Sequence, residues 1–524
     1  MNHRPTNSGL NVKERVAIIG AGMGGIAAAI RLSTFGYQVD VFEKEHAPGG
    51  KMREILVGGE AINAGPTVFT MRWVFDELLD ASGQSLEDVL EFKQADVLAR
   101  HAWENSPTLD LFADIDKSAD AIGAFAGALN AKSYKKFCTD SAKIFHTLKR
   151  SYIATQRPSP IGMMRNIGPL NIGAMLALKP FSTLWHTLGD YFPDPRMRQL
   201  FGRYATYCGS SPYSAPATLM LVAHVEQDGV FIAKGGMHGL AKALAGVAER
   251  QGVNFHYGSS VTRILHENGR AGGLVLSDGR VHAAGAVIFN GDASALAGGL
   301  LSQVGFNPPK IAAKDRSLSA MTWGFKAKIS GFEPAHHTVL FSNEYQNEFD
   351  AILKRGQVPA NPTTYLCLPD RQSDGTLMRP ANEGERVFCL INAPANGDTH
   401  TYSKQEILEC LKQTKAQMAR CGLTLEMMAE PQLAASPTEF NQLFPGSGGA
   451  LYGPASHGWM ASFKRQGART RLPGLYLAGG SVHPGPGVPM AALSGRLAAE
   501  SLIADRSMMP KFRRAVTSGG MPTD

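Results

Sequence analysis

The sequence contains no apolar run long enough to cross a bilayer. A membrane-spanning helix needs about 20 consecutive, mostly uncharged apolar residues, and the 524 residues include no such stretch. Residues 1–14 are polar and lack the apolar core of a secretory signal. We therefore expect a cytoplasmic protein that does not span the membrane.

Cysteine is scarce, and the motifs of metal and nucleophilic catalysis are missing. The six cysteines are far apart, without a CxxC pair, which fits free thiols better than a disulfide framework or a zinc site. HExxH, GxSxG, phosphate-loop and EF-hand patterns are also absent from the sequence. We expect no bound metal, and no motif identifies a catalytic residue.

The chain also lacks a strong excess of one charge. It has 52 Lys and Arg against 45 Asp and Glu, a formal net charge of +7 that is spread along the sequence. Because there is no basic arm, we do not expect nucleic acid as a partner. The excess fits either an ordinary solvated face or attraction to an anionic membrane surface.

The most informative stretch lies near the start of the chain. Val16–Ile19 form an apolar run typical of a buried strand, and Gly20-x-Gly22-x-x-Gly25 follows directly. In such a turn the glycines allow a tight reversal, close approach of a pyrophosphate and close packing of helix on strand. An Ala-rich helix and a second strand ending at Glu43 follow, and an acid at that position binds a ribose hydroxyl. The stretch predicts an adenine dinucleotide site.

A second glycine-rich loop follows a strand near the end of the chain. Leu475–Leu477 leads into Gly479-Gly480 and a Pro- and Gly-rich loop, and a helix begins at about Met490. The positive end of that helix, pointed at a flavin ring, would stabilise the anionic reduced flavin. With the first stretch, this loop favours FAD over NAD; the alternative is a structural helix with a glycine-rich cap. We expect His483 to hold the loop by hydrogen bonds rather than to act as a base.

Segments typical of a nucleotide-binding domain occur at the start, middle and end of the chain, with other material between them. We predict a discontinuous FAD-binding domain made of residues 1–75, 228–300 and 440–524. Residues 76–227 and 301–439 would form an inserted substrate-binding domain.

Residues 158–192 differ from the rest of the inserted material. They combine Pro and Gly breaks with an apolar run that contains Met, Leu and Trp. The segment is too short and too interrupted to span a bilayer. It is either a pair of core helices or an element that lies in the headgroup region of a membrane.

Together, these segments resemble the bacterial carotenoid desaturases, whose fold is that of the flavin-containing amine oxidases. The resemblance covers nearly the whole chain and rests on Gly20–Glu43, Gly49–Lys51, Asn63–Thr67 and Leu475–Pro489. The segments most similar to the 1-hydroxycarotenoid 3,4-desaturase (hydroxyneurosporene desaturase) branch are Ala64–Phe75, Leu109–Asp114, Gly449–Gly453 and Ser456–Trp459. The resemblance implies an α/β fold: a Rossmann-like FAD-binding domain of the flavin amine oxidase type, with an inserted mixed-sheet plus helical substrate domain.

The resemblance also implies roles for individual residues. The three glycines of the first turn would face the FAD pyrophosphate with Lys51 beside it, Glu43 would meet the adenosine ribose and Val261 the adenine. The other candidate cofactor-binding residues are Gly50, Gly65, Pro66, Thr67, Gly480, Val488, Pro489 and Met490. Asn63 departs from the family, which often has Asp there, so an acid's role in holding flavin or moving a proton is in question at this position.

The implied reaction removes two hydrogens from adjacent carbons of a 1-hydroxycarotenoid such as 1-hydroxyneurosporene, forming a 3,4 double bond. Loss of hydride from an allylic carbon leaves a delocalised cation whose neighbouring C–H is acidic. A weak base or water then suffices, in agreement with the missing catalytic dyad. Because the sequence contains no second nucleotide fingerprint behind a strand, a quinone or oxygen is favoured over NAD(P) as electron acceptor.

Four alternatives remain open on the same fold. They are phytoene or neurosporene desaturation, carotenoid isomerisation, oxidation of an amine by a flavin, and a non-catalytic lipid or prenyl carrier that needs no flavin. For the favoured reading we expect peripheral contact with the inner face of the cytoplasmic membrane, where the carotenoid substrate is dissolved.

Overall fold

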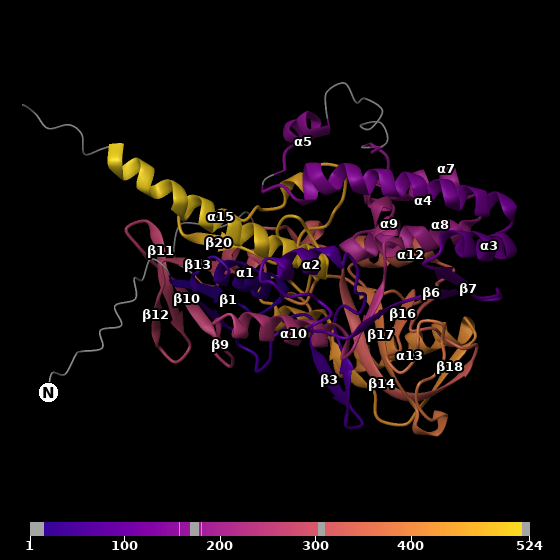
Figure 1. The fold of residues 1–524 in the computed structure, drawn as a ribbon. Coiled ribbons are helices and arrows are strands. Elements are labelled where there is room, and N and C mark those ends of the chain that lie inside the picture. Colours follow the sequence, from indigo (N-terminus) through magenta and orange to yellow (C-terminus); the bar gives the residue numbers. More distant parts are fainter. Residues whose placement is uncertain (1–14, 157, 168–177, 180, 302–309, 516–524) are drawn as a thin grey trace, which may run out of the picture.

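The computed structural model describes residues 15–156, 158–167, 178–179, 181–301 and 310–515. Two large sheets dominate the molecule, and Figure 1 shows them side by side, with helices above the second sheet. The predicted α/β fold with a mixed sheet in the inserted part is confirmed.

The first sheet is parallel and has the strand order β20-β13-β1-β2-β9. Its strands are β1 (Arg15–Ile19), β2 (Gln38–Phe42), β9 (Asn254–His256), β13 (Ala286–Phe289) and β20 (Leu475–Leu477). These strands come from the start, the middle and the end of the chain, as the predicted discontinuous domain requires. The domain boundaries at residues 75, 227, 300 and 439 stay a prediction.

Both faces of the parallel sheet are buried, so its strands are apolar on both sides. Val16 and Ile18 of β1 pack with α1 (Met23–Ser33), α10 (Gly236–Arg250) and α15 (Val488–Ala515). Ala17 and Ile19 face the opposite side. There they pack with an antiparallel meander of β10 (Val261–Glu267), β11 (Arg270–Leu276) and β12 (Val281–Ala283).

Helices α1 and α15 approach each other more closely than side chains would allow. A side chain at Gly495 would overlap the carbonyl oxygen of Gly24 and lie 3.0 Å from the backbone nitrogen of Ala28. A side chain at Gly24 would in turn lie 2.8 Å from the nitrogen of Gly479. Because Gly24 and Gly495 have no side chains, α1 and α15 can touch through their backbones at this point.

The second sheet is mixed and has the order β18-β14-β17-β16-β15-β6-β7, with β19 also pairing with β14. Only the β15–β6 pair is parallel among the described pairs of this sheet. Its strands are β6 (Val97–Ala102), β7 (Leu109–Phe112), β14 (Ser319–Gly331), β15 (His337–Leu340), β16 (Thr364–Cys367), β17 (Glu385–Ala393), β18 (Leu423–Met427) and β19 (Gln432–Ala435).

The two faces of the mixed sheet have different covers. On one face, Trp323, Phe325 and Leu366 pack with α13 (Lys404–Arg420). On the other, Val339 packs with the helical layer above the sheet in Figure 1. That layer includes α3 (Ile115–Ala126), α4 (Ala128–Leu148), α7 (Leu184–Tyr191), α8 (Pro195–Gly202), the 3-10 helix η3 (Arg203–Cys208) and α9 (Leu221–Gln227). Other elements are β5 (Phe92–Gln94), β8 (Phe231–Ala233), α2 (Trp73–Asp80), α5 (Pro160–Ile167), α11 (Ala293–Ala297), α12 (Tyr345–Asp350) and α14 (Pro437–Leu443).

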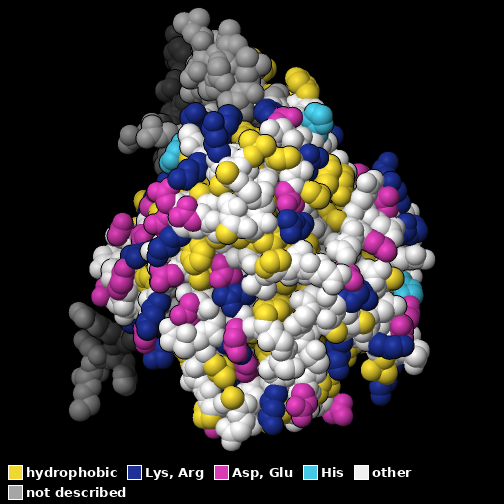
Figure 2. Space-filling view, turned by 90° about the vertical axis from the view of Figure 1, so that its right-hand side faces the viewer, with side chains coloured by type: hydrophobic (Ala, Val, Ile, Leu, Met, Phe, Trp, Pro, Cys, Tyr) yellow, Lys and Arg dark blue, Asp and Glu magenta, His cyan; other side chains and the backbone are white. Residues whose placement is uncertain are grey.

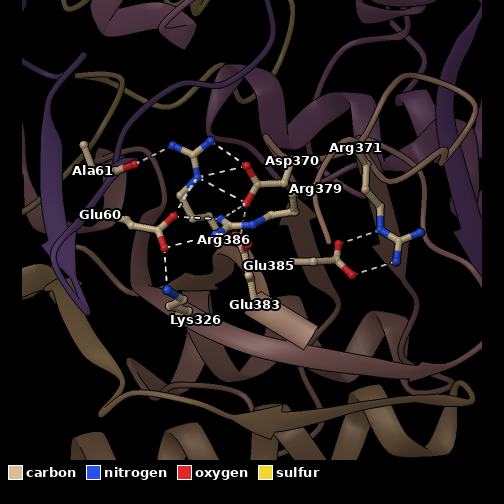
Figure 3. Close-up of polar contacts among 9 residues, drawn as sticks. All are labelled: Glu60, Ala61, Lys326, Asp370, Arg371, Arg379, Glu383, Glu385 and Arg386. Carbon is tan, nitrogen blue, oxygen red and sulfur yellow. Dashed lines mark hydrogen bonds and ion pairs between the residues drawn. The ribbon is translucent and has the colours of Figure 1, made fainter. Parts of the chain in front are cut away.

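A hairpin of β3 (Glu54–Val57) and β4 (Glu60–Asn63) connects the cofactor-side loops to the mixed sheet. Its Glu60 lies at the centre of the ionic network in Figure 3, where it pairs with Lys326 of β14 and with Arg379. Arg386 of β17 binds the carbonyl oxygen of Ala61 at 3.1 Å and also pairs with Asp370. These contacts fix the hairpin to one edge of the sheet face.

Part of the predicted membrane segment is a core element. In the parts of the chain that the structure describes, no helix is both long and apolar enough to cross a membrane. Leu184 and Leu188 of α7 are buried, so α7 belongs to the protein core. Ile161 of α5 and the nearby Phe181 are 80% and 87% exposed. Residues 168–177 lie outside the described residues.

Candidate functional site

The first glycine turn and the start of α1 form one wall of the candidate site. Gly22 is the N-cap of α1 and provides no side-chain acceptor, and the first turn contains no acidic residue. The free N–H groups and the positive end of this helix therefore suit an anion. Gly25 is required by packing, because a side chain there would overlap the carbonyl oxygen of Gly20.

The structure brings two other predicted loops to this turn. Gly49 donates from its nitrogen to the carbonyl oxygen of Ala21 at 2.9 Å, so the Gly49-Gly50 turn lies directly against the first glycine turn. Gly65 packs on the backbone of Lys51, where a side chain would overlap the Lys51 oxygen. The segments 20–25, 49–51 and 64–67 are therefore neighbours, as one binding site would need.

Glu43 lies just after β2 with a buried carboxylate at the same edge of the sheet. It accepts hydrogen bonds from the nitrogen of Ala21 at 2.7 Å and of Glu45 at 3.0 Å. Burial raises the pKa of this carboxyl, and the two backbone donors act against that rise. The carboxyl is thereby fixed at the end of the strand next to the glycine turn, where an acid is expected to bind ribose.

Two of the predicted residues make protein contacts that differ from their expected surroundings. The ammonium of Lys51 donates to the carbonyl oxygen of Leu451 and lies 5.2 Å from the centre of the Phe444 ring. The Thr67 hydroxyl is 2.6 Å from the hydroxyl of Tyr365, on the mixed sheet. Cofactor contact by either side chain stays a prediction, as do the roles of Pro66 and of Val261, which begins β10.

The closing loop reaches the first turn through the end of β20. Gly479 donates to the Ser494 hydroxyl at 2.7 Å, and Ala478 donates to the oxygen of Phe289 at 2.9 Å. Beyond Gly480 the chain runs to the N-terminus of α15 at Val488, with Pro489 and Met490 in its first turn. That turn also contains no acidic residue. Two helix N-termini thus flank the carboxyl ends of β1, β13 and β20, the edge at which parallel sheets bind ligands.

Sequence reasoning missed three polar residues at this edge. Asn290 donates to the oxygen of Gly20 at 3.1 Å and fills the space below the first turn. Asp292 caps α11 with one oxygen, while its other oxygen is buried without a partner among the described residues. The one available signal was their place directly after the strand β13.

Arg465 is the third missed residue, and no motif marks it. Its buried guanidinium donates to the oxygens of Tyr452 at 3.0 Å and Pro454 at 2.7 Å, and at 3.5 Å to those of Gly480 and Ser481. The side chain therefore joins the 452–454 loop to the closing loop. Burial lowers the pKa of this guanidinium, although an Arg side chain stays charged.

Asn63 and His483 have structural contacts. The Asn63 side chain accepts from the nitrogen of His238 at 2.9 Å and donates to the oxygen of Gly235 at 3.1 Å, at the start of α10. His483 lies 2.9 Å from the oxygen of Thr155 and donates from its own nitrogen to Gln466, so its predicted loop-holding contacts are confirmed. Burial lowers the pKa of His483 to about 4, which keeps the imidazole neutral.

A polar region begins where Thr67 meets the mixed sheet. The Tyr365 hydroxyl contacts Thr67 and lies 2.8 Å from Nδ1 of His337. His336, His337 and Cys367 offer ligand atoms within 4.8 Å of one another, but burial raises the pKa of the Cys367 thiol to about 12. A protonated thiol is a poor metal ligand, so the trio suits hydrogen bonding better than metal binding.

These features fit an FAD-sized anionic dinucleotide. The N-terminus of α1 offers N–H groups to phosphate, the Glu43 carboxylate offers an acceptor to ribose, and glycines replace side chains at the turn. The N-terminus of α15 lies at the same edge of the sheet, after the closing loop. The mixed sheet approaches this edge at Tyr365, whose hydroxyl contacts Thr67. A flat redox ring bound between the closing loop and that sheet would have protein on both sides.

Comparisons with known proteins find flavin-containing oxidoreductases and carotenoid desaturases. Residues 23–503 match the family of flavin-containing amine oxidoreductases. The chain is 48% identical over 515 residues to a hydroxyneurosporene desaturase of Rubrivivax gelatinosus, covering 97% of each chain. It is 31% identical to a 1-hydroxycarotenoid 3,4-desaturase of a Flavobacterium species, covering 93% of this chain and 98% of the relative. In fold it resembles an oxidoreductase from Methanosarcina mazei, with a TM-score of 0.57, 17% identity and coverage of 94% and 100%.

Glu348 of α12, deep in the interior, gives the protein a pH-dependent stability. Its carboxyl accepts from the nitrogen of Thr363 at 3.0 Å and from the Asn392 amide at 3.2 Å, and burial raises its pKa from 4.5 to about 7. Between these values the unfolded chain releases a proton that the folded chain keeps, so rising pH favours unfolding. The full penalty, about 3 kcal/mol, is reached above the folded pKa.

We expect Glu348→Gln to be as stable as the wild type near pH 4.5 and more stable at pH 8. Thermal midpoints measured from pH 4.5 to pH 8 test this, with Glu344→Gln, the exposed N-cap of the same helix, as control. If the two variants show the same pH dependence relative to the wild type, Glu348 is not the buried acid responsible.

Proposed function

We propose that this chain, which belongs to the flavin-containing amine oxidoreductase family, is an FAD-dependent desaturase that introduces the 3,4 double bond of a 1-hydroxycarotenoid. The observation that carries the proposal is the 48% identity, along 97% of both chains, to a hydroxyneurosporene desaturase. The cofactor is FAD, and the enzyme is an oxidoreductase that acts on CH–CH groups. Within the class, 1-hydroxyneurosporene is the proposed substrate.

The proposed cofactor contacts follow the arrangement of the loops. Gly20, Gly22 and Gly25 with the start of α1 would hold the pyrophosphate, and Glu43 the ribose. Gly50 and Gly65 would shape the same wall. The Gly480 loop and the first turn of α15, Val488–Met490, would lie at the ring end, where Arg465 fixes the loop from behind.

The protein's part in the reaction is to position the polyene and to exclude water. FAD, when bound, supplies the acceptor for the hydride that leaves the allylic carbon. The sheet face near Tyr365 includes buried apolar side chains such as Phe388, which would hold the chain in a dry environment. Correct positioning of reacting atoms alone accounts for a large part of many enzymatic accelerations. The resulting polyene cation loses its proton to a weak base, so no strong catalytic base is needed.

The proposed electron acceptor is a quinone or oxygen. We expect purified enzyme with FAD to desaturate 1-hydroxyneurosporene in liposomes without NAD(P), with a product two hydrogens lighter by chromatography and mass spectrometry. Phytoene, supplied in parallel, should be converted poorly. Strict dependence on NAD(P) would refute a quinone or oxygen as the electron acceptor. An isomerised product of unchanged mass would indicate an isomerase. A protein that never takes up FAD would indicate a carrier.

Replacement of Glu43 tests the cofactor site directly. Glu43→Gln removes the charge and one acceptor oxygen, so we expect FAD affinity to fall roughly tenfold or more. Titration of the apoprotein with FAD, followed by flavin fluorescence, measures this. Glu45→Gln, two residues away with an exposed side chain, is the matched control. Equal affinities in the two variants would remove Glu43 from the proposed site.

Contact with a membrane is proposed for the exposed apolar residues around α5. Ile161, Met164 and Phe181 are exposed, and the Phe181 ring lies 5.9 Å from that of Trp459. Apolar side chains of this kind insert into the boundary between headgroups and acyl chains. By contrast, Figure 2 shows positive and negative side chains interspersed over another face.

Flotation with anionic liposomes tests this contact. We expect Ile161→Asp/Phe181→Asp to float less than the wild type, while Leu408→Asp, at a 50% exposed position on α13, floats normally. Equal flotation of the two variants would count against the α5 region as the contact.

A further inference from the structure

The guanidinium of Arg203 is buried and only partly bound. The residue is 9% exposed at the start of η3, and its Nη2 donates to the Tyr207 hydroxyl at 3.2 Å. Its Nε has no partner among the described residues. Burial acts to lower the pKa of the guanidinium, but Tyr207 and the nearby Glu226 raise it. Arg cannot lose its proton in a protein, and a buried donor left unpaired is costly. The Nε donor is therefore open to a further acceptor.

Two phenols hold Glu226 beside Arg203. Tyr207 donates to one Glu226 oxygen at 2.6 Å, and Tyr204 donates to the other at 2.7 Å. The Tyr207 oxygen in turn accepts from Arg203. Tyr207 thus links the guanidinium to the carboxylate, and the Nε of Arg203 has no partner among the described residues.

Two more buried polar atoms without partners among the described residues belong to side chains whose pKa the charge of Arg203 acts to lower. They are Nε2 of His337 and the hydroxyl of Tyr345, in residues that are 3% and 7% exposed. Burial, then the charges of His336 and Arg203, keep the pKa of His337 well below its usual value, so its imidazole is neutral. The Trp185 ring joins the two sides of this region: it packs 3.4 Å from the side-chain position of Gly202 and 5.9 Å from the Tyr345 ring.

This region lies next to the proposed flavin site. His337 is one hydrogen bond from Tyr365, which itself contacts Thr67 of the cofactor-side loop. At the other end of η3, a side chain at Gly209 would meet Tyr452, whose carbonyl oxygen accepts from Arg465. The same Arg465 binds the closing loop. The 3-10 helix therefore connects Arg203, at its start, to the loop that Arg465 holds, at its end.

We propose that Arg203, Tyr345 and His337 bind the hydroxyl group of the carotenoid and determine the preference for hydroxylated substrate. This inference rests on the proposed function. The guanidinium Nε donates to the hydroxyl oxygen, and the hydroxyl donates to the Tyr345 oxygen or to Nε2 of the neutral His337. A hydroxyl on carbon 1 is only a few bonds from carbons 3 and 4, so its binding site has to lie near the reacting end. A hydrocarbon end leaves all three polar atoms unpaired and is rejected.

The test compares kcat/KM for 1-hydroxyneurosporene and neurosporene. Tyr345→Phe removes only an unpartnered hydroxyl, so we expect normal FAD content, no loss of thermal stability and a hydroxyl preference reduced roughly tenfold. Arg203→Met should reduce the preference roughly a hundredfold. Tyr213→Phe, in the same aromatic cluster, is the control and should keep the wild-type preference.

The ratio between substrates is informative because a merely structural defect lowers both rates together. An unchanged ratio in Tyr345→Phe and Arg203→Met, with 3,4-desaturation intact, overturns the hydroxyl site and leaves the proposed function standing. Failure of the wild type to desaturate either carotenoid overturns the proposed function instead. If Arg203→Met does not fold, Tyr345→Phe decides alone.

Discussion

The contact between Gly24 of α1 and Gly495 of α15 is the constraint on which the cofactor side depends. It brings the helix after β1 and the helix after β20 together, with Asn290 after β13 filling the space between the turns. Three strand ends and two helix N-termini thereby converge at one edge of the parallel sheet. Any side chain at this crossing would separate the helices and open the edge that is proposed to bind the pyrophosphate.

Buried cations organise the space between that edge and the mixed sheet. Arg465 stabilises loop geometry by donating to backbone carbonyl oxygens, whereas Arg203 is held by phenols and keeps unused donor capacity. Both are guanidinium groups in a dry environment, but they differ in how fully they are satisfied. A satisfied buried group indicates architecture, whereas an unsatisfied one calls for a partner such as water, an ion or a ligand.

The sequence predicted the cofactor edge well because its signals are local. Glycine spacing after a strand, an acid after the next strand and a Gly-Pro loop before a helix each depend on a few consecutive residues. The roles expected for the 49–51 and 64–67 segments came from the family resemblance instead. Residues such as Asn290, Asp292 and Arg465 have no local signature, since their roles arise only when distant segments meet.

The apolar run in 158–192 shows where prediction from composition fails. Composition alone could not separate Leu184, which is in the core, from Phe181, which is 87% exposed, although they are three positions apart. Which side a residue faces depends on the neighbour that covers it. The hydroxyl site was also beyond reach, because Arg203, His337 and Tyr345 lie in three separate elements.

The strand order of the parallel sheet has a consequence for how the chain folds while it is being translated. β20 and α15, which complete the same sheet edge as β1 and α1, are made more than 430 residues after them. Until then the apolar faces of the early segments have no final partner and need protection from aggregation. In the proposed arrangement of the cofactor contacts, the FAD site is therefore completed only after α15 has been synthesised.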